Sequence, residues 1–164
     1  MKRRHDEKLA LEKTAIELFI QIYNRNHTDK LRLLYQQERP DAVLQINDRS
    51  KLGLEITHLF DNELEAKIWL GRSHQELFIQ ETLDHLVEKL NHLIRRKEVK
   101  MAQYSNGYPI ALLIRNVSIY FGMSDILRCK DLIYKPQDLF TNIWLLSRDG
   151  YSDWVLKDLY NVEE

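Results

Sequence analysis

Residues 38–59, ERPDAVLQINDRSKLGLEITHL, carry most of the information about the fold. Two largely apolar segments, DAVLQI at 41–46 and LGLEITHLF at 52–60, flank turn-forming residues, which predicts two strands joined as a hairpin. Asp41 follows a proline at the start of the first segment, and Glu55 lies inside the second. Since an unpaired carboxylate is costly to bury, Glu55 needs either solvent or a partner that compensates its charge.

The hairpin predicts that these two carboxylates lie near each other. Alternation along the second strand places one set of residues on each face: Leu52, Leu54, Ile56 and His58 against Gly53, Glu55, Thr57 and Leu59. Asp41 and Glu55 come from adjacent strands and can converge at one end of the sheet. Two neighbouring carboxylates repel each other unless a cation or a proton intervenes, and hard oxygen ligands suit Mg²⁺ or Mn²⁺. The simpler alternatives are a turn-forming Asp41 and a solvent-facing Glu55.

The rest of the chain predicts a sheet covered by helices. The order of elements is helix, strand meander, long helix, strand, helix, strand, which indicates the α/β (α+β) class with a central mixed β-sheet flanked by helices. The expected elements are a helix at 6–24, a strand at 31–39, a helix at 62–104 interrupted near Gly71 and ended by Gly107, a strand at 109–117, a helix at 119–129, a strand at 139–147, and a short strand or helix at 149–160.

Two charged residues occupy apolar faces of these predicted helices. Glu12 falls inside the apolar stripe of the first helix, where it needs a partner; an internal ion pair or an edge position would also satisfy it. On the long helix, a leucine stripe continues onto Lys97, then Lys100 and Tyr104. Lys97 therefore points where a core leucine is expected. The alternative is a lysine that reaches solvent from the core edge near a helix C-terminus.

Bulk properties narrow the class of protein. The 164 residues suit a single domain, 1–164, and the net charge of −1 means that any nucleic-acid site must be a local basic patch. The single cysteine and the lack of an apolar run long enough to span a bilayer predict a cytoplasmic protein without a membrane partner.

A family resemblance follows from these segments. RPD at 39–41 and GLEIT at 53–57 resemble the motif of the PD-(D/E)xK nuclease superfamily, whose restriction-endonuclease-like core has a similar order of elements. Thr57 stands where that motif has its lysine. Some branches of the superfamily carry the lysine on the following helix, and KEVKMAQY at 97–104 resembles such a helix. Lys51 is a weaker candidate for the missing cation.

The resemblance implies a metal-dependent nuclease that hydrolyses phosphodiester bonds of DNA or RNA, with DNA favoured. Asp41, Glu55, Glu12 and the carbonyl of Ile56 would bind Mg²⁺ or Mn²⁺, and Lys97 would complete the catalytic set.

Lys100, Tyr104 and Arg96 would bind the substrate, the last as part of the basic segment LIRRKEVK at 93–100. A homodimer is compatible with the resemblance. The alternative function is a catalytically inactive nuclease-fold protein that binds nucleic acid or protein, and Thr57 and the near-neutral charge favour this alternative.

Overall fold

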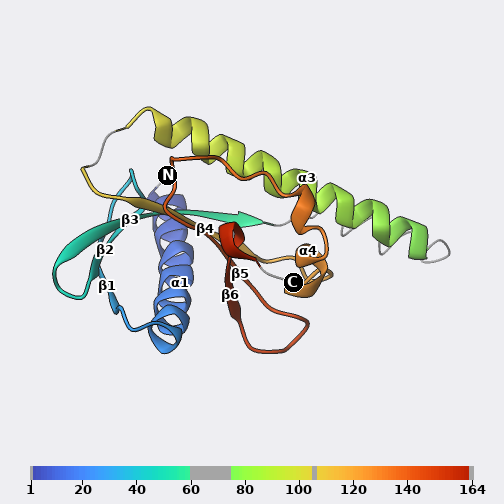
Figure 1. Ribbon diagram of the computed structural model, residues 1–164, viewed down its shortest axis with the longest axis horizontal. Helices are drawn as coiled ribbons and strands as arrows, with labels where there is room; N and C mark the ends of the chain where they lie inside the picture. The colour runs from blue at the N-terminus through green and yellow to red at the C-terminus, as the bar shows by residue number, and fades with distance from the viewer. Residues whose placement is uncertain (1, 60–74, 105–106, 163–164) are drawn as a thin grey trace.

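A six-stranded mixed sheet forms the centre of the protein. The computed structural model describes residues 2–59, 75–104 and 107–162. Its strands follow the order β1-β2-β3-β4-β5-β6 across the sheet (Figure 1). The prediction of a mixed sheet flanked by helices is confirmed. The elements are α1 (Lys2–Asn26), β1 (Leu31–Gln36), β2 (Ala42–Ile46), β3 (Ser50–Leu59), α3 (Gln75–Ala102), β4 (Ile110–Asn116), α4 (Met123–Leu127), β5 (Ile143–Ser147) and β6 (Val155–Asp158), with short 3-10 helices at Lys130–Leu132 and Leu159–Asn161.

The first half of the sheet is an antiparallel meander. β1 pairs with β2, and β2 pairs with β3 in a register that sets Ala42 opposite Leu54. The turn between β2 and β3 contains Asn47 and Asp48 with φ of 51° and 58°. Asn and Asp tolerate this left-handed region better than most residues, and it suits the twist of a tight hairpin. The predicted hairpin is therefore present.

The second half of the sheet is mainly parallel. β3, β4 and β5 run in the same direction, and β6 closes the edge as an antiparallel neighbour of β5. The long apolar runs of β4 and β5 fit this position, because strands covered on both faces need apolar side chains on both.

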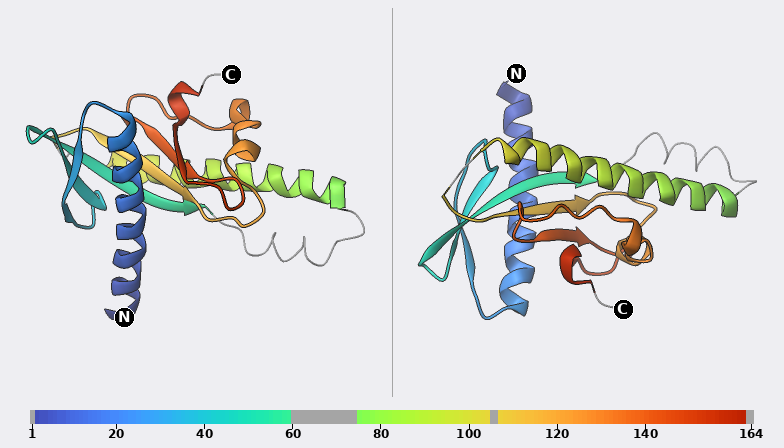
Figure 2. Two further views of the ribbon diagram at one scale, coloured as in Figure 1. Left: turned by 90° about the horizontal axis from the view of Figure 1, so that it is seen from below. Right: turned by 45° about the horizontal axis from the view of Figure 1, so that its top comes forward.

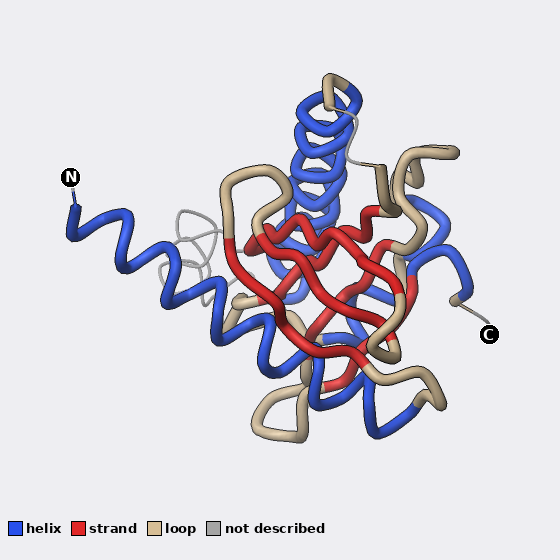
Figure 3. The backbone as a smooth tube through the Cα atoms, turned by 90° about the vertical axis from the view of Figure 1, so that its left-hand side faces the viewer, coloured by secondary structure: helices blue, strands red, loops and turns tan. Residues whose placement is uncertain are grey.

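The two long helices cover opposite faces of the sheet. Ile16 and Phe19 of α1 belong to one core cluster, together with Leu54 of β3. Leu90 of α3 belongs to a second cluster, together with Leu112 of β4. Figure 2 shows the sheet between α1 and α3, and Figure 3 shows α1 crossing one face of the twisted sheet. No helix in the described part of the chain is long and apolar enough to cross a membrane.

Several boundaries differ from the sequence prediction: the strands expected at 31–39 and 139–147 are shorter, and the first helix is longer than 6–24. The helix expected at 119–129 is wrong in extent, because only Met123–Leu127 is helical. The Ser118 hydroxyl accepts hydrogen bonds from the backbone of Tyr120 and Phe121, and such side-chain contacts compete with helix formation. The long helix ends at Ala102, five positions before Gly107. The predicted helical part at 62–74, with the interruption near Gly71, lies outside the described residues.

Candidate active site

Asp41 and Glu55 lie next to each other in the β2–β3 hairpin. The register of the hairpin places Asp41, just before β2, beside Glu55 on β3. The backbone N–H of Ile56 donates to Asp41 Oδ2 over 2.8 Å, and the N–H of Asp41 donates to Glu55 Oε2 over 3.3 Å. Both side chains are buried, with exposed fractions of 2% for Asp41 and 0% for Glu55. Each carboxylate is thus held by the backbone of the other strand.

Gly53 allows this arrangement, and its role was not predicted. A Cβ atom at position 53 would lie 2.8 Å from Cγ of Pro40 and 3.1 Å from Ile110 and Tyr108 side-chain atoms. Such a contact is too short for carbon atoms, so only glycine lets Pro40 pack this closely on β3. Since Pro40 immediately precedes Asp41, the close packing helps to fix the position of the carboxylate.

Two lysines from α3 meet the carboxylates. Lys97 Nζ and Lys100 Nζ both lie 2.6 Å from Glu55 Oε1, and Lys97 Nζ lies 3.8 Å from Asp41 Oδ2. Their spacing of three positions puts both side chains on one face of the helix. Lys97 is the more enclosed of the two, with 18% of its side chain exposed against 32% for Lys100. The cation expected from the leucine stripe therefore does reach the carboxylates.

The four charged groups, Asp41, Glu55, Lys97 and Lys100, form what we call the carboxylate cluster. Burial raises the pKa of Asp41, and the charge of Glu55 raises it further, against the effect of Lys97. Burial also acts to raise the pKa of Glu55, but Lys97 and Lys100 together bring it below the ordinary value. A proton entering the pair is therefore held more readily by Asp41 than by Glu55.

Glu12 of α1 lies near this cluster and has unusual acidity. Its exposed fraction is 4%, as expected for a residue on the apolar stripe. Burial raises its pKa to about 7, and the charge of Asp41 adds to the rise. Lys8 Nζ lies 3.6 Å from Glu12 Oε1 but opposes this only weakly, since 65% of the Lys8 side chain is exposed. Both protonation states of Glu12 are therefore populated near neutral pH.

A groove of about 370 Å³ opens beside the carboxylate cluster. We call it the entry groove; its lining includes Lys8, Glu12, Arg39 and Lys100. Because Lys100 belongs to the cluster and Glu12 lies beside it, the groove connects the buried charges with solvent. Its exposed cations suit a phosphate group.

The remaining predicted residues lie around the cluster. Arg39 donates a hydrogen bond to the Tyr104 hydroxyl, and its guanidinium lies 4.8 Å from the centroid of the Tyr104 ring. Tyr104 therefore contacts Arg39 and not the two carboxylates. Arg96 and Lys51 are exposed, and Thr57 is buried on the face that Glu55 shares.

The donor chemistry fits a hard divalent cation. Asp41 and Glu55 supply carboxylate oxygens, and the backbone of Ile56 runs beside them, so oxygen donors of the kind that Mg²⁺ and Mn²⁺ prefer are present. No three His, Cys, Asp or Glu side chains in the described ranges are grouped closely enough to hold a metal ion. Glu12 therefore lies near the pair without forming a three-carboxylate set with it.

No family model matches this chain, and no curated protein and no solved structure matches it either.

Proposed function

We propose that this protein is a metal-dependent nuclease of the PD-(D/E)xK type, with the restriction-endonuclease-like fold. The observation that supports it best is the carboxylate cluster. Two buried acids from a hairpin and a lysine from the following helix meet within 2.6–3.8 Å, although the lysine is 42 positions from Glu55 in sequence. The meander β1-β2-β3 followed by α3 and by β4 parallel to β3 supports the same assignment.

In this proposal Asp41, Glu55 and the carbonyl of Ile56 hold Mg²⁺ or Mn²⁺. When bound there, such an ion would supply a water of lowered pKa and would stabilise charge that develops on a phosphate oxygen. The hydrogen bond from the Ile56 N–H fixes the Asp41 carboxylate, so that its orientation is set before a ligand arrives.

Lys97 takes the role that the superfamily motif gives to a lysine at the position of Thr57. Its ammonium group lies between Asp41 and Glu55, so it is placed to contact a water or a phosphate oxygen held at the same carboxylates. Lys100, more exposed and bordering the entry groove, binds the phosphate of the incoming strand. A fixed cation at this position stabilises negative charge in the transition state.

In this proposal Glu12 is the residue that accepts or donates a proton during catalysis. We assign it to proton transfer and not to metal ligation, because it is not grouped with the other two acids. A pKa of about 7 lets it accept or donate a proton at neutral pH, which is the property that general acid–base catalysis requires. It also borders the entry groove, where substrate and water arrive.

One feature favours the second candidate function, a non-catalytic binding module. Two lysines face two carboxylates, so the carboxylate cluster is balanced in formal charge without a metal ion. Such a cluster could serve stability alone, with the entry groove as a binding surface for nucleic acid.

Cleavage assays separate the two functions. Purified protein is incubated with Mg²⁺ or Mn²⁺ and labelled single- or double-stranded DNA, and with RNA as the second substrate. The nuclease proposal predicts cleavage that EDTA abolishes and that falls about a hundredfold or more in Asp41→Asn and in Lys97→Met. Mn²⁺ binding, followed by calorimetry, is expected to weaken in Asp41→Asn.

Matched controls exist on the same hairpin. Asp48→Asn and Lys51→Met change exposed residues of the same types, and both should leave cleavage unchanged. No cleavage of any substrate together with no Mn²⁺ binding would contradict the nuclease. Nucleic-acid binding that persists without cleavage and weakens in Lys100→Met would instead support the module.

A further inference from the structure

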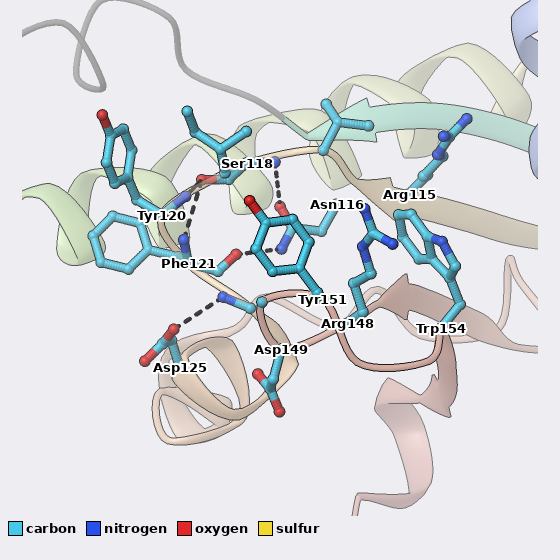
Figure 4. Close-up of a pocket in the computed structure, with 14 residues that line it drawn as sticks. Arg115, Asn116, Ser118, Tyr120, Phe121, Asp125, Arg148, Asp149, Tyr151 and Trp154 are labelled. Atoms are coloured by element: carbon cyan, nitrogen blue, oxygen red, sulfur yellow. Dashed lines mark hydrogen bonds between the residues drawn. The ribbon is translucent and has the colours of Figure 1, made fainter.

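A second cavity, of about 450 Å³, lies at the carboxyl ends of β4 and β5. We call it the arginine cavity; Arg115, Asn116, Arg148, Tyr151 and Trp154 are among the residues that line it (Figure 4). The carboxyl ends of parallel strands are a common place for ligands in open sheets with helices on both faces. A volume of this size is typical of small-molecule sites.

The loops around the cavity are fastened to each other. Asp149 accepts hydrogen bonds from the backbone N–H and the hydroxyl of Ser124, at 3.0 and 2.6 Å. A Cβ atom at Gly122 would lie 2.5 Å from the carbonyl oxygen of Arg148, so the two loops touch through glycine. Asn116 at the end of β4 donates to Ser147 at the end of β5 over 2.9 Å. The cavity is therefore preformed.

Two arginines, Arg115 and Arg148, line this cavity, and neither has a counter-charge among the described residues. Arg148 Cζ and Arg115 Cζ lie 4.9 and 5.3 Å from the ring centroid of Trp154, so both cations share one indole. Nε and Nη1 of Arg115 are buried and have no hydrogen-bond partner among the described residues. Burial lowers the pKa of Arg115, and the charge of Arg148 lowers it further. Two positive charges held this close together favour the binding of an anion beside them.

Neighbouring side chains do not supply that anion. The acids that line the cavity are engaged elsewhere: Asp149 with Ser124, and Asp125 with the backbone of Gly122. Figure 4 shows both carboxylates directed away from Arg148. None of the ion pairs seen in the described ranges includes either arginine. His58, the register partner of Arg115, has its pKa lowered to about 4 by burial and by Arg115, and it is therefore neutral at pH 7.

An exposed aromatic ring completes the cavity. The Tyr151 side chain is 100% exposed and lines the same cavity as Arg148 (Figure 4). A fully exposed aromatic ring offers a stacking surface for a planar group. The cavity thus combines recognition of a phosphate with recognition of a ring, and a nucleotide contains both.

We propose that the arginine cavity binds a nucleotide, with its phosphate on the exposed Arg148, where the charge of Arg115 adds to the attraction, and with its base against Tyr151. The ligand is either a free mononucleotide or the phosphorylated end of a nucleic-acid strand, which present the same chemistry. The cavity is separate from the carboxylate cluster, because Arg115 lies three positions beyond Leu112, the register partner of Glu55, and on the opposite face of the sheet. The proposal is independent of the nuclease activity.

Calorimetry on the 164-residue chain tests this proposal. The measurements use the Asp41→Asn variant in EDTA, so that metal-dependent binding at the carboxylate cluster is removed. The probes are adenosine 5′-monophosphate, adenosine and inorganic phosphate. We expect saturable binding of the mononucleotide, weaker binding of phosphate and no binding of adenosine. Arg148→Gln should weaken mononucleotide binding about tenfold or more. The matched control is Arg32→Gln, which changes an exposed arginine of β1 that pairs with Asp48.

Arg148 is exposed, so its glutamine variant should fold normally, as circular dichroism can verify. Oligonucleotides with and without a 5′-phosphate distinguish the two sources: a strand end binds more tightly than the free mononucleotide if the strand is the ligand, and less tightly if the mononucleotide is. Absence of mononucleotide binding, binding unchanged in Arg148→Gln, or equal affinity for phosphate and mononucleotide would overturn the proposal.

Discussion

Replacement of Lys97 by methionine tests how the carboxylate cluster is held together. The change keeps most of the apolar side chain and removes the ammonium group that lies 2.6 Å from Glu55 and 3.8 Å from Asp41. Truncating one partner of a buried ion pair costs about 3–5 kcal/mol. Since Lys100 still contacts Glu55, we expect the lower end, about 3 kcal/mol of unfolding free energy, which corresponds to about 6–12 °C in Tm for a domain of this size.

Urea unfolding followed by circular dichroism measures this loss. Lys100→Met should cost less, about 1–2 kcal/mol, because Lys100 contacts Glu55 and not Asp41 and its side chain is 32% exposed. Lys51→Met, at an exposed position, should stay within about 0.5 kcal/mol of the wild type. The Lys97→Met deficit should shrink as the pH falls, because the two carboxylates then become protonated. A loss under about 1 kcal/mol in Lys97→Met, or a larger loss in Lys100→Met than in Lys97→Met, would show that Lys97 is not the main counter-charge of the cluster.

Three further predictions concern single positions. Because the pKa of Glu12 is raised to about 7, the folded state binds a proton that the unfolded state releases, so stability should fall as pH rises from 4.5 to 7; Glu12→Gln should abolish this decline in urea midpoints. Gly53→Ala should cost about 1–3 kcal/mol in thermal unfolding, because its Cβ would press against Pro40, and an unchanged Tm would argue against this contact. The pKa of His58 is lowered to about 4, so stability should be lost as pH falls from 6.5 to 4, and His58→Phe should reduce that loss.

The sequence pattern located the carboxylate cluster because its signals are local. Alternation along β3 placed Glu55 on the face that it shares with Leu59, and the leucine stripe placed Lys97 where a core leucine is expected. The structure shows that these two faces meet. The position of Glu12 on its helix likewise indicated burial. Each of these inferences needs only the periodicity of one element, and that periodicity reads directly from the chain.

Other features depend on contacts between distant segments. Gly53 is needed at its position because Pro40 packs against it, and no repeat or spacing in the sequence predicts such a contact. Arg115, Arg148 and Trp154 come together only after β4 and β5 have paired, so their shared cavity has no local pattern. The helix expected at 119–129 was too long because the spacing of apolar residues carries no information about the hydrogen bonds of the Ser118 side chain.

Cleavage of end-labelled double-stranded DNA, with Mg²⁺ or with EDTA, is the most direct test of the proposed function. Wild-type protein should cut the DNA only with Mg²⁺, and Lys97→Met, with its fold verified, should cut it about a hundredfold more slowly or not at all. Cleavage by Lys97→Met at the wild-type rate would contradict the role given to the lysine on α3.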